Sequence, residues 1–328
     1  MKPYFLRTVL RSIRLSLVFM LSIGFLVAGC GKRQAGEMGK PIIRVVGVNQ
    51  FAPHPILDAV YAGLYKRLAA ETNLSIVVKN ANGDRVLCHQ INERFVQEGV
   101  SVIVALGTPA AQSAVAVSKA RIPVVFGAIT DPVGAKLAES LEKPGGNKTG
   151  TTNRWPFRKQ VELVRKLYPT AKTLGVVVNP SEANCEAGMI VIRQAAKDLG
   201  FKLIEIPVSA SSEVTTAVEA LKGRADVMLI SPSNDVYTAL DALLGAALRM
   251  GLPVVGGDET AVKRGSLATY GFSNEDVGIA TAECVLNIFK GDRPVGEIPV
   301  VAPPTAQLFL NREKLAVYGL VLPPDLEK

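Results

Sequence analysis

Short apolar runs alternate with longer amphipathic segments along most of the chain. The runs with strand character lie at 42–48, 75–78, 102–106, 124–127, 149–152, 173–178, 202–206, 227–230, 254–256, 266–270 and 307–310. Between them, apolar residues recur at helical spacing, which predicts helices near 55–68, 86–97, 109–119, 158–168, 184–199, 212–222, 236–250, 273–290 and 312–319. Strands that alternate with helices favour parallel sheets covered on both faces. We therefore predict an α/β fold.

Three of the apolar runs occur twice, in the same order. The runs at 45–49, 102–106 and 122–125 are matched by those at 175–179, 227–231 and 252–255. The offsets between matched positions are 130, 125 and 130 residues, which predicts two Rossmann-like lobes of similar architecture. In an open parallel sheet, ligands bind beyond the carboxyl ends of the strands. Two such edges facing each other would form a ligand-binding cleft.

The chain is expected to pass between the lobes more than once. Passages near 146–152, 268–272 and 300–305 would join them as a multi-strand hinge. This assigns 42–148 and 273–299 to an N-terminal lobe, and 149–272 and 300–328 to a C-terminal lobe. Closure of two lobes about a hinge is a known response to ligand binding.

The first 29 residues differ in kind from the rest. Four basic residues are followed by an apolar stretch at 15–28, which is shorter than the ~20 residues of a bilayer span and suits an export signal. The small residues before Cys30 resemble the lipobox of bacterial lipoproteins. This resemblance implies cleavage before Cys30, a lipid on that cysteine, a tether at 30–41 and an extracytoplasmic, membrane-anchored protein. An ordinary signal peptide or a membrane anchor is the alternative.

Charge and cysteine content exclude some functions. The chain has 37 Lys and Arg against 29 Asp and Glu, a net charge of +8. Four of the 37 lie in the predicted signal, which leaves 33 basic residues and +4 spread along the chain, so nucleic acid is not an expected partner. Cys88, Cys185 and Cys284 show no metal-binding spacing, and we expect free, mostly buried thiols, with no metal and no cofactor.

Six stretches carry a resemblance to a known family. They are HPILD at 54–58, TPAAQ at 108–112, TDPVG at 130–134, EKPGGN at 142–147, NPSEAN at 179–184, and the segment at 258–265 that begins with DE and ends with VKRG. In this order, they resemble the ABC-transporter substrate-binding lipoproteins of the tryptophan/tyrosine-binding type, over 42–324. The resemblance implies a type I periplasmic-binding-protein fold and a monomer. It also implies delivery of a small, amino-acid-like solute to an ABC permease and its ATPase.

Candidate site residues of the first half follow two predicted strands. Thr108 ends a strand and Pro109 starts a helix, so the free N–H groups of Ala110 and Ala111 could bind a carboxylate. The Thr108 hydroxyl would either add a donor or merely cap the helix. In the next loop, Thr130 is a further candidate. Asp131 could bind an ammonium group, or it could only shape the turn before a proline.

The second half offers matching candidates. Asn179, Ser181 and Asn184 follow a strand, and Ser181 would either bond a carboxylate across the cleft or act as a helix N-cap. By the repeat, Asn234 lies on a loop that faces Thr108. Asp258, after the strand at 254–256, is the expected ammonium partner, with a surface carboxylate as the alternative.

Two aromatic residues could form the wall of the ligand site. Trp155 is the only tryptophan of the chain, and it could either stack on a planar ligand or pad the hinge. Phe51 follows the first strand and has a comparable place.

Catalysis is not expected. Only His54 and His89 could act as histidine acid–base groups, and metalloprotease, phosphate-loop and nucleophile-elbow motifs are absent from the sequence. We therefore predict a solute-binding lipoprotein of an ABC importer that closes on its ligand. The alternative is a sensing module that presents its closed form to a membrane receptor kinase.

Overall fold

A computed structural model describes residues 43–302 and 306–327. The predicted signal peptide at 1–29, the predicted lipid site Cys30 and the tether at 30–41 lie outside the described residues. Within the described ranges, none of the helices combines the length and the apolar character that a membrane crossing requires.

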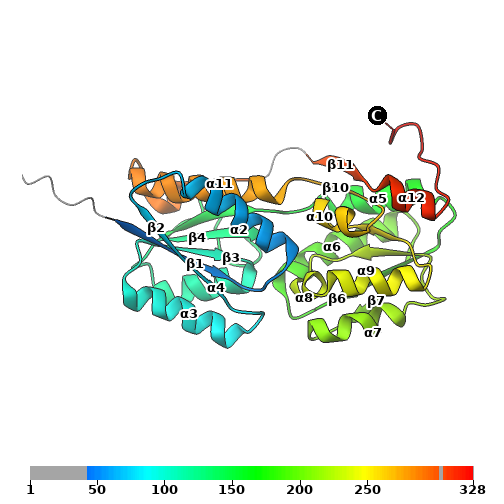
Figure 1. Ribbon diagram of the computed structural model, residues 1–328, viewed down its shortest axis with the longest axis horizontal. Coiled ribbons are helices and arrows are strands. Elements are labelled where there is room, and N and C mark those ends of the chain that lie inside the picture. Colours follow the sequence, from blue (N-terminus) through cyan, green and yellow to red (C-terminus); the bar gives the residue numbers. More distant parts are fainter. Residues whose placement is uncertain (1–42, 303–305, 328) are drawn as a thin grey trace, which may run out of the picture. The chain divides into compact units, whose positions relative to one another are not determined.

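The first lobe is built on a five-stranded parallel sheet with the strand order β2-β1-β3-β4-β5. Its strands are β1 (Arg44–Gln50), β2 (Leu74–Asn80), β3 (Val102–Leu106), β4 (Val124–Ile129) and β5 (Lys148–Thr152). Helices α2 (Pro55–Leu68) and α11 (Asn274–Lys290) cover one face, and α3 (Arg85–Glu98) and α4 (Thr108–Ser118) cover the other (Figure 1). Strands β3 and β4 are buried along their whole length, which explains their unbroken apolar sequence.

Helices α2 and α11 touch backbone to backbone, although they are far apart in the sequence. A Cβ atom on Gly63 would lie 2.0 Å from the carbonyl oxygen of Glu275, and one on Gly278 would lie 2.0 Å from that of Val60. Only glycine allows so close an approach. Ser273 caps α11 by accepting the backbone N–H of Asp276 at 3.2 Å, as the sequence predicts.

The second lobe carries a four-stranded parallel sheet with the order β7-β6-β8-β9. Its strands are β6 (Thr173–Val178), β7 (Lys202–Pro207), β8 (Val227–Ile230) and β9 (Val254–Gly256). The helices are α5 (Phe157–Leu167), α6 (Ala183–Asp198), α7 (Val214–Glu219), α8 (Asn234–Thr238), α9 (Leu240–Arg249), α10 (Glu259–Arg264) and α12 (Arg312–Val317). A short 3-10 helix, η1 (Ser211–Glu213), also belongs to this lobe, and β10 (Ala268–Gly271) pairs antiparallel with β11 (Gln307–Leu310). A second 3-10 helix, η2 (Val295–Glu297), lies on the first lobe, where the carbonyl of Gly296 accepts the N–H of Gly145 at 3.0 Å.

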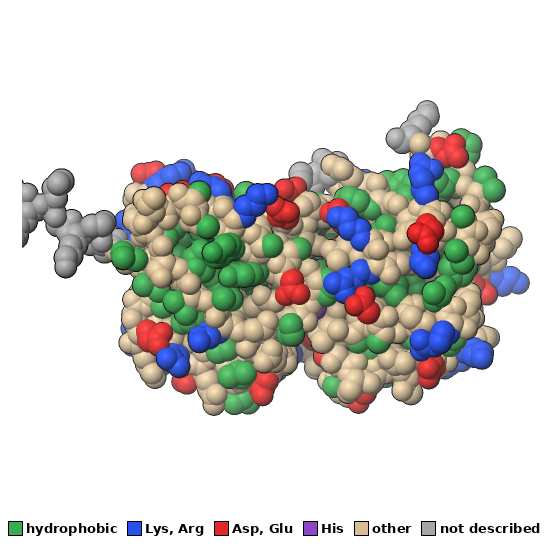
Figure 2. Space-filling view, in the orientation of Figure 1, with side chains coloured by type: hydrophobic (Ala, Val, Ile, Leu, Met, Phe, Trp, Pro, Cys, Tyr) green, Lys and Arg blue, Asp and Glu red, His purple; other side chains and the backbone are tan. Residues whose placement is uncertain are grey.

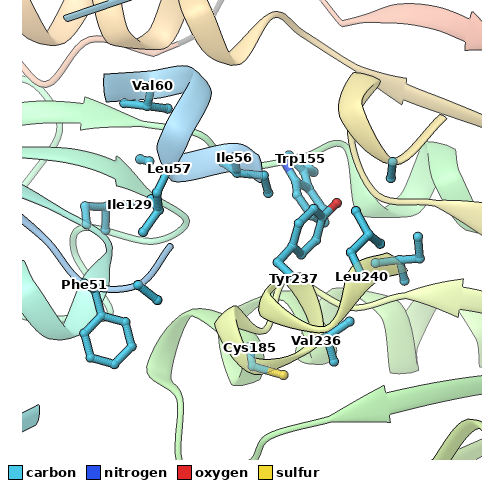
Figure 3. Close-up of a cluster of buried hydrophobic side chains, with 14 of the residues drawn as sticks. Phe51, Ile56, Leu57, Val60, Ile129, Trp155, Cys185, Val236, Tyr237 and Leu240 are labelled. Carbon is cyan, nitrogen blue, oxygen red and sulfur yellow. The ribbon is translucent and has the colours of Figure 1, made fainter. Parts of the chain in front are cut away.

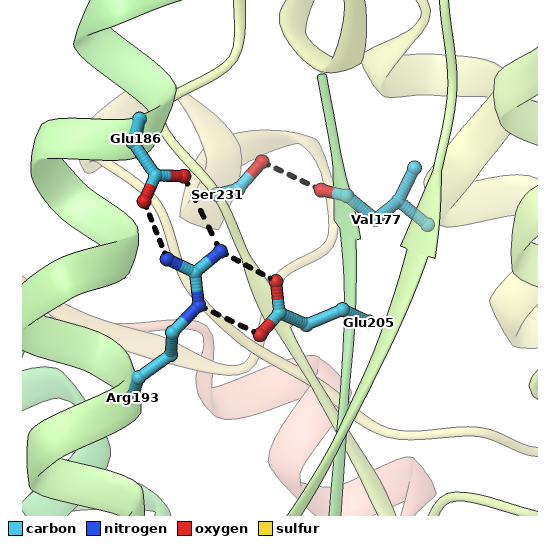
Figure 4. Close-up of polar contacts among 5 residues, drawn as sticks. All are labelled: Val177, Glu186, Arg193, Glu205 and Ser231. Atoms are coloured by element: carbon cyan, nitrogen blue, oxygen red, sulfur yellow. Dashed lines mark hydrogen bonds and ion pairs between the residues drawn. The ribbon is translucent and has the colours of Figure 1, made fainter. Parts of the chain in front are cut away.

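Arg193 ties α6 to the edge strand of the second sheet (Figure 4). Its Nε and Nη2 donate to the two carboxylate oxygens of Glu205 at 2.8 Å each, and its Nη1 donates to Glu186 at 2.6 Å. Beside it, the Ser231 hydroxyl donates to the Val177 carbonyl at 2.7 Å and joins the ends of β8 and β6. The start of α6 and the loop after β8 are thereby held in place.

The two-lobed α/β prediction is confirmed, with corrections of detail. Residues 149–152 belong to β5, which pairs with β4, so the predicted lobe boundary after residue 148 is wrong and the first sheet extends to Thr152. The predicted helix at 236–250 begins at Asn234 and is broken at Ala239 into α8 and α9, and α10 was not predicted. The third predicted passage, near 300–305, includes 303–305, which lie outside the described residues.

The three cysteines described by the structure are free and buried, on α3, α6 and α11, in agreement with the sequence. Burial raises the pKa of Cys88 to about 11 and the pKa values of Cys185 and Cys284 to about 12. The thiol form therefore dominates at neutral pH. On the surface, the face seen in Figure 2 carries acidic and basic side chains interspersed.

Candidate ligand-binding site

Polar side chains follow three neighbouring strands at the carboxyl edge of the first sheet. Thr108 opens α4 after β3, Thr130 follows β4, and Asn153 follows β5. All three are nine-tenths or more buried. From the second lobe, Asn184 at the start of α6 and Asn234 at the start of α8 meet them. The two strand-end edges thus face each other, as the internal repeat predicts.

These residues enclose a small pocket between the lobes. Its lining consists of His54, Ile56, Leu57, Thr108, Ala128, Thr130, Asn153, Trp155, Asn184, Pro232, Ser233, Asn234 and Tyr237. The free volume is about 20 Å³, room for roughly one water molecule. The side chains of the two lobes therefore fill most of the space between them.

Aromatic rings supply much of that filling. Trp155 lies on the passage that follows β5, and its ring centre is 5.5 Å from that of Tyr237 on α8. Tyr237 in turn lies 5.9 Å from the ring of His54. Figure 3 shows Ile56, Trp155 and Tyr237 next to one another, whereas Phe51 lies apart from them.

His54 connects the two lobes directly. It caps α2, and its Nδ1 accepts the backbone N–H of Leu57 at 3.5 Å, which leaves the ring proton on Nε2. Nε2 then donates to the Asn234 Oδ1 of the second lobe at 3.2 Å. Burial lowers the pKa of His54 to about 4, so the ring is neutral at neutral pH. A second bond between the lobes runs from Arg85 Nη2 to the Ser181 carbonyl at 3.3 Å.

The pocket is polar but carries no formal charge. None of its lining residues, all within the described ranges, is Asp, Glu, Lys or Arg, and His54 is neutral. Seven buried side-chain polar atoms of the described residues have no hydrogen-bond partner, and three of the seven line this pocket. They are Thr108 Oγ1, Asn153 Oδ1 and Trp155 Nε1.

Five of the twelve residues predicted for the site and its wall line the pocket. They are Thr108, Thr130, Asn184, Asn234 and Trp155. Asn179, Ser181 and Phe51 instead line a separate cavity of about 430 Å³, which also contains Arg85. There the Ser181 hydroxyl donates to Asn179 Oδ1 at 2.7 Å. The predicted alternative role of Ser181 as an N-cap is wrong, because Glu182 occupies that position of α6.

The other predicted residues lie beside or behind the pocket. The Asp131 carboxylate accepts the backbone N–H of Gly134 at 3.0 Å, which matches its alternative role in shaping the turn. Ala110 and Ala111 are fully buried in α4, and the N–H of Ala111 donates to the Gly107 carbonyl at 3.0 Å. The expected free N–H of Ala111 is therefore wrong, because the helix begins one residue earlier than predicted, with Gly107 as its N-cap.

Asp258 is buried behind Tyr237 and does not line the pocket. Its Oδ1 accepts from the Tyr237 hydroxyl at 3.1 Å and from the N–H of Ala261 at 2.9 Å, and its Oδ2 accepts from Asn274 at the start of α11. Burial raises the pKa of this carboxyl. The alternative of a surface carboxylate is wrong, because Asp258 is buried. The expected ammonium partner lies outside the pocket lining, with both of its oxygens already bonded to groups of the protein.

Glu182 is a second buried carboxylate near the site. It accepts the backbone N–H of Asn234 at 2.7 Å, and burial raises its pKa. This bond fixes the first turn of α8, which carries both Asn234 and Tyr237 into the pocket.

Sequence reasoning also missed His54, Asn153 and Tyr237, all of which line the pocket. Asn153 could have been found, because it follows a strand just as Thr108 does. The partner of His54 is 180 residues away in the sequence, and no local pattern indicates it.

Two parallel α/β lobes closed over a pocket at their strand ends define a class of proteins that hold a small molecule between lobes. A family model described as ABC transporter substrate binding protein matches residues 45–328. The chain belongs to this family.

Individual relatives agree with that membership. The chain is 33% identical over 275 residues to a tyrosine-binding protein of Clostridioides difficile (strain R20291), covering 82% of this chain and 79% of the relative. It is similar to the ABC domain in complex with L-Trp from Streptococcus pneumonia, with 28% identity, a TM-score of 0.82, and coverage of 87% of this chain and 97% of that one. It is also similar to the ligand-free, open structure of a substrate-binding protein with adhesive properties from Clostridium difficile. The identity is 31%, the TM-score is 0.65, and the match covers 86% of this chain and 97% of that one.

Proposed function

We propose that this protein is the extracytoplasmic binding lipoprotein of an ABC importer, and that it binds an aromatic amino acid between its lobes. The observation that carries the proposal is the uncharged pocket, to which both lobes contribute at their strand ends. Its aromatic and aliphatic walls suit an aromatic side chain, and its few convergent polar groups suit a small polar head. The tyrosine-binding relative and the L-Trp complex support this ligand class.

Ligand entry requires the lobes to separate. A free volume of about 20 Å³ is far below that of the pockets, ~300 Å³ or more, that hold small organic ligands. The chain superposes better on the L-Trp complex, with a TM-score of 0.82, than on the ligand-free, open relative, with 0.65, although the sequence identities are similar. This difference supports a hinged protein whose closed form the structure represents. The closed form would then dock on the permease.

The anchor belongs to the same proposal. Cleavage before Cys30 and a lipid on its thiol would hold the binding unit at the membrane surface, where a monomer can meet the permease. Replacement of Cys30 by serine should release the protein from membranes into the soluble fraction, and incorporation of labelled fatty acid should be lost with it. Unchanged membrane association of Cys30→Ser would argue for a different anchor.

The test of function uses residues 31–328, which contain the whole compact unit from Ile43 onward. Thermal-shift screening against the twenty amino acids is followed by isothermal titration of each hit. Stabilisation by tyrosine, tryptophan or phenylalanine, with one site per chain, is the expected result. Stabilisation only by ligands without an aromatic ring, or by no amino acid, would contradict the proposal.

A further inference from the structure

Three unpartnered polar atoms converge on the pocket in a chemically specific set. The Trp155 indole N–H can only donate, the Asn153 Oδ1 can only accept, and the Thr108 hydroxyl can do either. The three residues are 4%, 7% and 2% exposed, so bulk water does not satisfy them. Buried polar groups in native proteins are nearly always hydrogen-bonded, so a cluster of unpartnered ones calls for an additional partner.

Two of the three groups stand on the rigid edge of the first sheet. Thr108 is the first residue of α4, directly after the N-cap Gly107, which follows β3. Asn153 is fixed by its backbone N–H, which donates to the Ile129 carbonyl at the end of β4, at 3.1 Å. Trp155 is two residues further along the same passage. This arrangement therefore does not require the second lobe to be in place.

Two donors and one acceptor in an uncharged site match the zwitterionic head group of an α-amino acid. A carboxylate accepts two hydrogen bonds and an ammonium group donates, and together they are neutral. We propose that Thr108, Asn153 and Trp155 form the head-group subsite of this pocket, which binds an α-amino acid zwitterion through neutral dipoles. Thr108 and Trp155 donate to the α-carboxylate, and Asn153 accepts from the α-ammonium group. The proposal rests on the proposed function, because it names the part of the amino acid that these residues hold.

The carboxylates near the pocket already accept hydrogen bonds from other groups of the protein. Both oxygens of Asp258 already accept from protein donors behind Tyr237. Asp131 binds the backbone of its own turn, and Glu182 binds the backbone of Asn234. An ammonium group in the pocket therefore meets a carboxamide oxygen rather than a charged partner, and net charge on the ligand is selected against.

The first part of the test removes each polar atom, by Asn153→Leu and Thr108→Val with little change of shape, and by Trp155→Phe with loss of one of the two indole rings. Three probes separate the head-group functions: L-tyrosine, 3-(4-hydroxyphenyl)propionate, which lacks the amine, and tyramine, which lacks the carboxylate. Titration calorimetry measures the strong complexes, and ligand-observed NMR with millimolar probe measures the weak ones. Asn287→Leu and Thr216→Val, on exposed helix positions far from the pocket, are the matched controls.

The expected result is a pattern across probes. Asn153→Leu weakens L-tyrosine binding by about 10- to 100-fold and leaves the amine-free acid unchanged. Thr108→Val and Trp155→Phe each weaken L-tyrosine and the acid by about 10-fold or more, and leave tyramine unchanged. The two control variants bind all three probes as the original protein does.

A second readout concerns the unliganded protein. Because Thr108→Val and Asn153→Leu replace an unpartnered buried polar group by an apolar one, they should leave the melting temperature equal or higher. A clear fall in melting temperature would mean that these groups serve folding, and it would overturn the proposal. Equal losses for all three probes, or unchanged L-tyrosine affinity, would also overturn it while the proposed function stands. If the original protein binds none of the aromatic amino acids, both fail together.

Discussion

Acidification should open the lobes through His54. In the closed form, burial holds the pKa of His54 at about 4, against an ordinary value of 6.5 that exposure in an open cleft would restore. A depressed histidine pKa means that the closed form favours the neutral ring. This contribution to closure is complete above pH 6.5 and is lost progressively as the pH falls from 6.5 toward 4.

The size of the effect follows from those two values. At pH 5 the exposed ring is almost fully protonated, whereas the buried ring still is mostly neutral. The difference corresponds to about 1.5 pKa units, or roughly 2 kcal/mol, which lowers the ratio of closed to open protein about 30-fold relative to pH 7.5. The protonated ring keeps its Nε2 bond to Asn234, but its Nδ1 can no longer accept the N–H of Leu57.

Trp155 offers a direct assay, because it is the only tryptophan and it lies against Tyr237 in the closed pocket. Its fluorescence maximum and the radius of gyration from X-ray scattering are followed from pH 7.5 to 4.5. The original protein should shift toward the open form, and His54→Gln should respond much less. Glu182 and Asp258 have pKa values raised by burial and titrate in the opposite sense, but both proteins contain them. Equal pH responses of the two proteins would refute the reasoning.

Three further predictions concern stability and reactivity. Gly63→Ala should lower the free energy of unfolding, measured by urea titration, by ~1–3 kcal/mol, because its Cβ would meet the Glu275 carbonyl. The matched change Gly245→Ala, in an open helix position of α9, should raise the free energy of unfolding by ~0.5–1 kcal/mol. Equal effects of the two substitutions would contradict the close helix contact. Arg193→Met should lower the free energy of unfolding by about 1 kcal/mol at low salt and by less at high salt, since it leaves Glu186 and Glu205 without their shared cation. A loss of stability that does not depend on salt would contradict this account. The three buried cysteines should resist iodoacetamide at pH 8 and react together after denaturation, as followed by intact mass, and rapid labelling of any one of them in the native protein would be inconsistent with its raised pKa.

The fold could be predicted because its determinants are local. A strand covered on both faces must be apolar throughout, as β3 and β4 are, and the repeat of such runs reveals two lobes without any knowledge of contacts. The error at β5 has the same origin. Its sequence KTGTT is not apolar, although four of its five residues are buried, so it resembled a connecting passage rather than a sheet strand.

The site was predictable only where strand ends determine it. Thr108 and Asn234 follow buried strands, and both line the pocket at the strand ends where that rule expects them. The same rule selected Asp258, but Tyr237 lies between this carboxylate and the pocket. The position of Tyr237 follows from the packing of α8, which the sequence pattern does not reveal. The role of His54 depends on its bond to Asn234 Oδ1 of the other lobe, and the pattern of apolar and polar residues does not indicate contacts between distant positions.

The glycine contact between α2 and α11 has a mechanical consequence. One helix starts at the interlobe histidine, and the other starts where the second connecting passage arrives from the far lobe. With carbonyl groups pressed against Cα atoms and no flexible side chain between them, the pair cannot slip by a fraction of a turn. We therefore expect a twist of the incoming passage to reach His54 through this rigid helix pair and to change its bond to Asn234 in the other lobe.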